Sequence, residues 1–216
     1  MVGALLWDLD GVIVSSGHYH YLAYREVLDP LGVELTEDRY LTRLFGKRNE
    51  DILREVLGSR MTGEEIARLA GKKEEAFRRI VSGNVRALPG AEALLRRARR
   101  GGLKQCIVSS TPLANVELIL RSLGVRDLLD AIVAEEDVSR GKPDPQGFLL
   151  GAERLGIPPA QCVVLEDAPE GIAAGKRAGA RCVGVATTRP AEMLSVADLV
   201  VKSLEDERLV RFVFGA

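Results

Sequence analysis

Two acidic residues, Asp8 and Asp10, follow an apolar run over residues 3–7 and precede Gly11. The run is too short for a helix, so it predicts a buried strand that ends in a tight turn. Residues two apart in extended backbone can point the same way, and neighbouring carboxylates raise each other's pKa unless a cation lies between them. Mg²⁺, which prefers oxygen ligands, would relieve that repulsion. Taken alone, the pair could also be a solvated turn or a helix cap.

Further polar residues lie near other predicted strand ends. Ser109 and Ser110 follow the apolar run 103–108, Glu166 and Asp167 follow the run 162–165, and Lys142 lies in a proline-rich loop, 141–145, before a predicted helix. Ligands of open parallel sheets bind beyond the carboxyl ends of the strands. Carboxylates, a hydroxyl group and a lysine gathered there would suit phosphoryl transfer, which depends on positioning and charge neutralisation. Considered one at a time, the serines could be turn residues, the lysine a solvated loop charge, and the two carboxylates a favourable charge at the N-terminus of the next helix.

The segment after the first turn has helical periodicity. Apolar residues at three- and four-residue spacing predict helices over 18–28, from about 36, over 49–57 and over 62–81. Thr62 and Glu65 form a predicted capping box at the start of the last helix. No strand is expected between residues 14 and 82, and residues 82–84 are the expected exit hinge. The segment is therefore predicted to be a helical insert of about seventy residues.

From residue 89 onward, helices and apolar strands alternate. Helices are predicted over 89–100, 113–123, 145–155 and 169–178 and from 204 onward, and strands over 103–108, 131–134, 162–165, 182–185 and 198–201. Such alternation indicates a parallel sheet with helices on both faces. The fold class is therefore α/β: a Rossmann-like, three-layer core over residues 1–14 and 84–216, with an inserted helical domain over 15–83.

The composition excludes several function classes. Among 216 residues, 46% are hydrophobic and the net charge is −1, so no basic field attracts nucleic acid. No apolar run reaches the roughly 18 residues of a membrane span, and no signal peptide is apparent, so a cytoplasmic location is expected. Three widely spaced cysteines, Cys106, Cys162 and Cys182, are predicted to be reduced and buried, without a functional role.

The ordered motifs resemble those of the haloacid dehalogenase superfamily. The matching segments are Asp8-Leu9-Asp10-Gly11-Val12, Val108-Ser109-Ser110-Thr111, Gly141-Lys142-Pro143-Asp144-Pro145, and Leu165-Glu166-Asp167 followed by Gly171-Ile172-x-Ala174. The insert resembles the helical cap domain of the group that contains β-phosphoglucomutase and small sugar-phosphate and phosphoglycolate phosphatases. The resemblance extends along nearly the whole chain.

The resemblance implies a role for each motif residue. Asp8 would be the nucleophile that forms an aspartyl-phosphate, and Asp10 the general acid and base. The magnesium ligands would be Asp8, Asp10 through its backbone carbonyl, and Asp167, with Glu166 as a further carboxylate at or just outside the metal. The phosphate-binding residues would be Ser109, Ser110 and Lys142. Because dehalogenases lack the second aspartate, Asp10 favours phosphate ester chemistry.

The choice between phosphatase and mutase depends on the insert. His20 and Gly46 match the β-phosphoglucomutase pattern, although a histidine on a helix with tyrosines is more often a packed or surface residue than a catalytic one. Phe45 and Asn49 stand where that mutase has a lysine and an arginine. Because a mutase must hold a second phosphate there, these two departures favour a phosphatase.

Lys47 and Arg48, beside Gly46, could still supply phosphate-binding charge by another geometry. The prediction is a magnesium-dependent phosphatase that acts on a small phosphorylated metabolite, as a monomer or small homo-oligomer. A phosphosugar mutase is the alternative. A hypothesis of another class is a receiver-like phosphoacceptor without turnover, although receiver domains lack a long helical insert after the first strand.

Overall fold

The computed structural model describes residues 2–58 and 61–215 of the chain. Contacts between Cα atoms divide the chain into a core unit, Met1–Ser15 with Arg86–Ala216, and a helical unit, Ser16–Val85. These divisions fall one and two residues after the predicted domain boundaries. That each unit is a domain in its own right stays a prediction.

The core unit is built on a parallel sheet of six strands in the order β3-β2-β1-β4-β5-β6. The strands are β1 (Ala4–Trp7), β2 (Lys104–Val108), β3 (Ala131–Val133), β4 (Cys162–Glu166), β5 (Arg181–Val185) and β6 (Leu199–Val201). Strand β1 lies between β2 and β4, so the strand order reverses on either side of it. Its carboxyl end is therefore a topological switch point, where ligands of such sheets bind.

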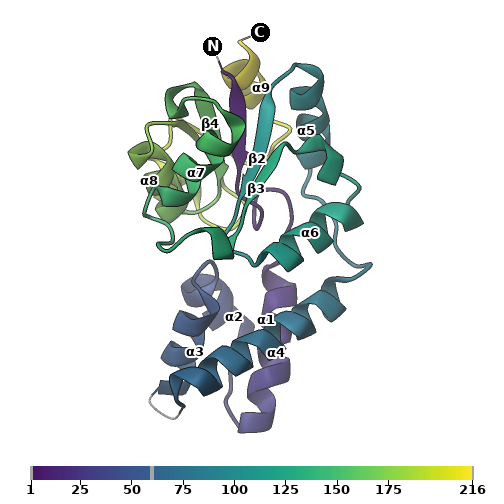
Figure 1. The fold of residues 1–216 in the computed structure, drawn as a ribbon, viewed down its shortest axis with the longest axis vertical. Helices are drawn as coiled ribbons and strands as arrows, with labels where there is room; N and C mark the ends of the chain where they lie inside the picture. Colours follow the sequence, from purple (N-terminus) through teal and green to yellow (C-terminus); the bar gives the residue numbers. More distant parts are fainter. Residues whose placement is uncertain (1, 59–60, 216) are drawn as a thin grey trace. The chain divides into compact units, whose positions relative to one another are not determined.

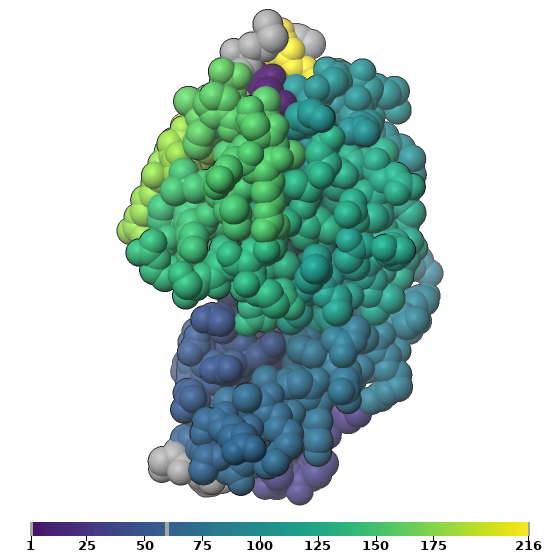
Figure 2. All heavy atoms as spheres, viewed as in Figure 1, coloured from purple at the N-terminus to yellow at the C-terminus, as the bar shows by residue number. Residues whose placement is uncertain are grey.

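Helices cover both faces of this sheet. They are α5 (Ala91–Arg100), α6 (Leu113–Ser122), α7 (Gln146–Leu155), α8 (Pro169–Arg177) and α9 (Glu207–Phe214), with short 3₁₀ turns at Arg126–Leu128, Glu135–Asp137, Pro159–Gln161 and Ala191–Leu194. Figure 1 shows α7 and α8 on one side of the strands and α5 on the other. In the space-filling view, green side chains from the α7 region cover the strands on their side (Figure 2).

Alternate strand residues supply the two core faces. Ala4 and Leu6 of β1 pack with Phe148 of α7 and Ile172 of α8 in one apolar cluster. On the opposite face, the Trp7 indole donates to Gln105 Oε1 at 3.2 Å, and Gln105 in turn donates to a carbonyl of α5. The period of two along each strand is thus used on both faces, and the predicted three-layer α/β core is confirmed.

The helical unit has its own apolar cluster. Its helices are α1 (Gly17–Leu28), a 3₁₀ turn at Asp29–Leu31, α2 (Glu37–Arg39), a π-helical turn at Tyr40–Leu44, α3 (Asn49–Leu57) and α4 (Gly63–Val81). Tyr24, Leu28, Leu53 and Ile66 are among the residues buried together in it. The capping box at the start of α4 is present, with Thr62 Oγ1 accepting from the Glu65 N–H at 3.3 Å. Within residues 14–58 and 61–82 the structure contains no strand.

The last predicted helix begins later than expected. Asp206 caps α9 by accepting from the Arg208 N–H at 2.9 Å, so the helix starts at Glu207 rather than at Leu204. Leu204 is instead a buried residue of the preceding turn. Cys106, Cys162 and Cys182 are free and buried, as predicted. Across residues 2–58 and 61–215, the structure has no helix with the length and apolar character of a membrane span.

Candidate active site

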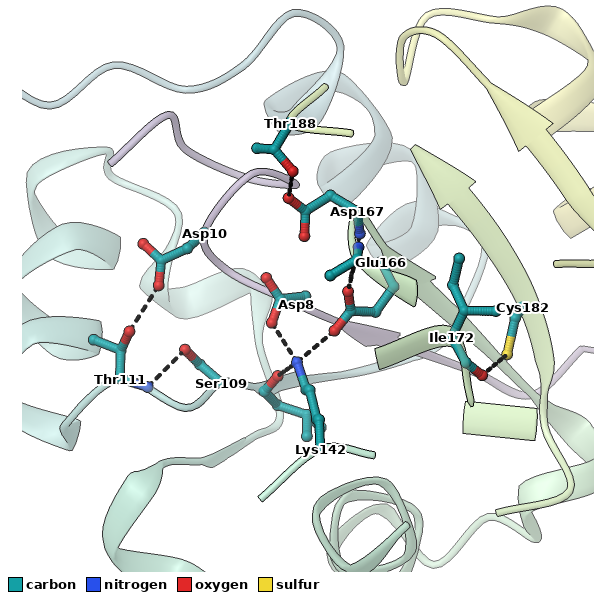
Figure 3. Close-up of polar contacts among 12 residues, drawn as sticks. Asp8, Asp10, Ser109, Thr111, Lys142, Glu166, Asp167, Ile172, Cys182 and Thr188 are labelled. Atoms are coloured by element: carbon teal, nitrogen blue, oxygen red, sulfur yellow. Dashed lines mark hydrogen bonds and ion pairs between the residues drawn. The ribbon is translucent and has the colours of Figure 1, made fainter. Parts of the chain in front are cut away.

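Lys142 is the centre of a charged cluster at the carboxyl edge of the sheet. Its ammonium donates to Asp8 Oδ1 and to Glu166 Oε1, each at 2.5 Å, and to the carbonyl of Val108 at 3.2 Å (Figure 3). These partners lie at the ends of β1, β4 and β2. The paired register of Trp7 with Ile107 and Leu165 brings these strand ends level. One lysine therefore joins three neighbouring strand ends.

Glu166 is held by the start of α8 as well as by Lys142. Its Oε2 accepts the backbone N–H groups of Asp167 and Ala168, both at 3.0 Å, and the residue is only 1% exposed. Gly171 makes room for this carboxylate, since a Cβ there would lie 1.9 Å from Glu166 Oε1. Position 171, in the fourth motif, thus requires a glycine because any larger side chain would overlap the Glu166 carboxylate.

Asp167 lies against the turn that follows β1. The Thr188 hydroxyl donates to its carboxylate, and the Thr187 hydroxyl donates to the carbonyl of Gly11. Gly11 has a φ of +89°, and a Cβ there would lie 2.1 Å from Asp167 Oδ2. A glycine is therefore required both for the turn and for the approach of Asp167.

Sequence reasoning missed the two threonines at residues 187 and 188. A signal for them existed, because they follow the carboxyl end of β5, where functional residues of a parallel sheet gather.

Asp10 does not point with Asp8, contrary to the expectation from strand periodicity. Strand β1 ends at Trp7 and the chain bends at Leu9, so the alternation of extended backbone no longer applies. Figure 3 shows Asp8 turned toward Lys142 and Asp10 turned toward Thr111. Thr111 Oγ1 donates to Asp10 Oδ2 at 2.7 Å. Thr111 lies within the second motif, but its own role was not predicted.

Ser109 and Ser110 lie directly after β2. The Ser109 hydroxyl accepts the N–H of Thr111 at 3.1 Å, and Ser109 is 5% exposed. Both serines line a small pocket together with Lys142 and Phe148. The three predicted phosphate-binding residues, Ser109, Ser110 and Lys142, thus lie around the same pocket.

Burial and repulsion between carboxylates raise the pKa values of Asp8 and Asp167. Burial raises the pKa of Asp8 well above its ordinary value; Lys142 opposes this shift, while Glu166 and Asp167 add to it. Burial and repulsion from Glu166 raise the pKa of Asp167 to about 7. Burial lowers the pKa of Lys142, but attraction to Asp8 and Glu166 outweighs that effect, so its pKa is raised. The cluster therefore has more negative charge than one lysine balances.

The donor set fits a hard divalent cation. Asp8 and Asp167 offer only oxygen atoms, and the cation would relieve the repulsion that raises their pKa values. Within residues 2–58 and 61–215, no three His, Cys, Asp or Glu side chains already converge on one metal position. The carboxylates contact Lys142, Thr111 and Thr188 instead.

The remaining predicted residues belong to the helical unit. His20 is buried, stacks on Phe77 with ring centroids 3.8 Å apart, and contacts Lys73 Nζ through Nδ1 at 2.8 Å. Gly46 has a φ of +91° in a turn. Lys47 pairs with Glu55 at 2.7 Å.

Arg48 is the N-terminal flanking residue of α3. Its carbonyl accepts from the Ile52 N–H at 3.1 Å, as the first bond of that helix. These four predicted residues are thus spread over α1, the turn before α3 and the start of α3.

A buried polar network around Lys73 was not predicted. Lys73 Nζ contacts Glu74 Oε1 at 2.8 Å, and Asn49 donates to the same oxygen at 2.6 Å. The Tyr24 hydroxyl donates to Asn49 Oδ1 at 2.6 Å. The sequence held one signal, because Lys73 occupies a core position in the apolar stripe formed by Ile66, Ala70, Phe77 and Val81.

The fold and the site define an α/β enzyme with a charged cluster at the switch point of its sheet and an inserted helical segment. The family model of haloacid dehalogenase-like hydrolases matches residues 2–179. The chain belongs to this family of hydrolases.

Two curated relatives and one solved structure are similar over almost the whole chain. Validoxylamine A 7'-phosphate phosphatase of Streptomyces hygroscopicus subsp. limoneus is 33% identical, over 96% of this chain and 97% of its own. β-Phosphoglucomutase of Bacillus subtilis (strain 168) is 35% identical, over 94% of this chain and 90% of its own. The crystal structure of β-phosphoglucomutase from Clostridium difficile has a TM-score of 0.88 at 29% identity, covering 100% and 98% of the two chains.

Proposed function

We propose that the protein is a magnesium-dependent phosphatase that hydrolyses a small phosphorylated metabolite, such as a sugar phosphate. The observation that carries the proposal is the contact of Lys142 Nζ with Asp8 Oδ1, beside Glu166 and Asp167. An aspartate so placed can act as a nucleophile, while a lysine neutralises the charge of the phosphoryl oxygens. The similarity to a named phosphatase supports this reading.

The reaction proceeds in two balanced steps. An oxygen of Asp8 attacks phosphorus, the bond to the leaving oxygen breaks, and Asp10 gives that oxygen its proton. Water then attacks the phosphorus of the aspartyl-phosphate, Asp10 takes the proton, and Asp8 and inorganic phosphate are released. Ser109 and Lys142 hold the phosphoryl oxygens throughout.

A magnesium ion held by Asp8, Asp167 and the Asp10 carbonyl would supply charge neutralisation at the phosphoryl group. Glu166 contributes by holding Lys142, because its oxygens accept from that ammonium and from two backbone N–H groups.

Two residues of the helical unit favour a phosphatase over a mutase. Phe45 and Asn49 replace the charged residues of the mutase pattern, and both are packed or bonded internally. The Phe45 ring lies 6.0 Å from that of Tyr40, and Asn49 bonds Tyr24 and Glu74. A second phosphate would find neither of the two cations that the mutase pattern supplies at these positions.

A phosphosugar mutase is the second candidate, favoured by the 35% identity to β-phosphoglucomutase. Two assays run in parallel distinguish the phosphatase from the mutase. The first measures phosphate release from a panel of sugar phosphates in Mg²⁺. The second measures conversion of β-glucose 1-phosphate to glucose 6-phosphate, primed with the bisphosphate. We expect phosphate release, and its loss when the divalent metal is chelated. Conversion without release would support the mutase and overturn the proposal.

The nucleophile is tested by Asp8→Asn. We expect phosphate release to fall by at least about 10⁴-fold, the scale seen when an enzyme loses its nucleophile. Asp127→Asn, an exposed aspartate of the core unit, is the control and should match the wild type. A fully active Asp8→Asn protein contradicts the mechanism. Stable phosphorylation of the wild type without turnover would instead favour the phosphoacceptor.

A further inference from the structure

Thr111 contacts Asp10 from a distant part of the chain. Thr111 Oγ1 donates to Asp10 Oδ2 at 2.7 Å, across 101 positions of sequence, and the threonine is 7% exposed. Figure 3 shows that the Asp10 carboxylate is turned toward this hydroxyl and away from the Asp8–Lys142–Glu166 cluster. The hydrogen bond therefore holds one oxygen of a carboxylate that is turned away from Lys142.

Thr111 is itself held firmly. Its N–H donates to Ser109 Oγ at 3.1 Å, and its carbonyl accepts the N–H of Glu135 at 3.2 Å. A β-branched side chain has few χ1 rotamers, so a fixed backbone also fixes the hydroxyl. Thr111 thus provides a rigid donor at the end of β2.

Asp10 needs such a donor more than Asp8 does. It follows the bend at Leu9 and precedes Gly11, whose φ is +89°, and its side chain is only partly buried. The terminal torsion of an aspartate is broad, so packing alone defines the direction of its oxygens poorly. A hydrogen bond to one oxygen narrows the range of both side-chain torsions.

We infer that Thr111 is a positioning residue, which orients the Asp10 carboxyl for proton transfer to the leaving oxygen; this inference rests on the proposed function. When Asp10 carries a proton on Oδ1, Oδ2 still accepts from Thr111. The threonine exchanges no proton with substrate and acts only through Asp10.

The dependence of rate on leaving group reveals this role. An alkoxide leaving group needs a proton as the P–O bond breaks, whereas p-nitrophenolate leaves without one. The parameter kcat/KM reports the first irreversible step, which includes departure of the leaving group. A variant with a misdirected Asp10 should therefore lose hydrolysis of alkyl phosphates selectively.

The experiment compares kcat/KM for glycerol 3-phosphate and p-nitrophenyl phosphate in Mg²⁺. We expect Thr111→Val to lower the value for the alkyl ester by about 10- to 100-fold, part of the 10²–10⁴-fold effect of general acid catalysis, with p-nitrophenyl phosphate nearly unchanged. Thr111→Ser should restore the alkyl ester rate. Asp10→Asn should show the same selectivity in stronger form.

Thr42→Val is the matched control, since the Thr42 hydroxyl also donates a hydrogen bond, at 2.7 Å to the Asp38 carbonyl, but in the helical unit. It should leave both rates unchanged. An equal loss for both esters in Thr111→Val, or no loss for either, overturns the inference. If Thr111→Val gives either of these results while Asp8→Asn abolishes turnover, the inference is overturned and the proposed function is not. Where glycerol 3-phosphate is not hydrolysed, the sugar phosphate of the panel that the wild type hydrolyses fastest replaces it. A wild type that releases phosphate from no ester of the panel overturns the proposed function and the inference together.

Discussion

Lys142 faces more negative charge than it can balance. Asp8, Asp10, Glu166 and Asp167 lie at the ends of β1 and β4, and a single ammonium contacts two of them, at 2.5 Å each. Burial of the site, together with this imbalance, raises the pKa values of Asp8 and Asp167. A divalent cation is the simplest species that would complete the charge balance, and the dianionic phosphoryl group needs that positive charge as well.

A substitution at Gly171 tests whether Glu166 positions Lys142. A Cβ at position 171 would meet Glu166 Oε1 at 1.9 Å, so Gly171→Ala must displace the carboxylate that holds Lys142. We expect kcat/KM for phosphate release to fall by about 10²-fold, the scale of a misplacement near 1 Å at a catalytic centre. Overpacking should also cost about 1–3 kcal/mol of unfolding free energy.

Gly71 is the matched control. It is a helical glycine of α4, exposed, with no atom within 4 Å of the added Cβ. Gly71→Ala should raise stability in urea by up to about 1 kcal/mol and leave activity unchanged. Full activity in Gly171→Ala would contradict the placement of Glu166.

Three helices of the helical unit meet at one buried ion pair. Lys73 and Glu74 of α4 are 2% and 7% exposed, with His20 of α1 and Asn49 of α3 bonded to them. A buried charge that loses its partner is strongly destabilising. The network therefore links the three helices at a polar point inside an otherwise apolar unit.

Glu74→Gln tests this network through its pH dependence. Burial raises the pKa of Glu74, but Lys73, His20 and hydrogen bonds outweigh burial, so the pKa lies below its ordinary value. The ionised Glu74 carboxylate therefore stabilises the folded state at pH values above the unfolded pKa. This stabilisation is lost as the pH falls through the folded pKa. At pH 7, we expect the variant to lower the opening free energy of α4 amides by about 3–5 kcal/mol, measured by hydrogen exchange.

The difference between wild type and Glu74→Gln should shrink as the pH falls below the ordinary pKa of glutamate, about 4.3, and on through the lower folded pKa, because the wild-type carboxylate is then progressively protonated. Glu75→Gln, an exposed neighbour on the same helix, should change the opening free energy little at either pH. A Glu74→Gln difference that stays constant over this range would contradict an ionised Glu74.

At the scale of the whole chain, the spacing of apolar residues predicted the fold, because burial in the core determines that spacing. Strands buried on both faces are continuous apolar runs, and helices between them show three- and four-residue spacing. The parallel α/β core predicted on this basis is confirmed. The rule that ligands bind beyond strand ends also led to Asp8 and Glu166, and the structure brings both into contact with Lys142 of the loop before α7.

The side-chain partners could not be predicted in the same way. Thr111 reaches Asp10 across 101 residues, and Thr188 reaches Asp167 from the end of β5. Strand order and rotamers decide such contacts, and neither is encoded in local spacing. The bend at Leu9, which separates Asp8 from Asp10, was missed for a related reason: periodicity holds only while the strand continues.

In the proposed mechanism Asp8 accepts the phosphoryl group while Asp10 donates and accepts protons, and Asp10→Asn separates these roles. With p-nitrophenyl phosphate, the first step needs no acid, but hydrolysis of the aspartyl-phosphate lacks its base. We expect a burst of about one p-nitrophenolate per chain, followed by slow turnover. The phosphoryl group should then accumulate on the protein in the presence of Mg²⁺.

The most direct measurement is the location of that group. Borohydride reduces an acyl phosphate of aspartate to homoserine, and the tryptic peptide ending at Arg25 contains both Asp8 and Asp10. Fragmentation of this peptide by mass spectrometry should find homoserine at position 8 in Asp10→Asn, and none in the Asp8→Asn protein. A burst without modification of Asp8, or with the phosphoryl group on another residue, would contradict the proposed role of Asp8 as the nucleophile.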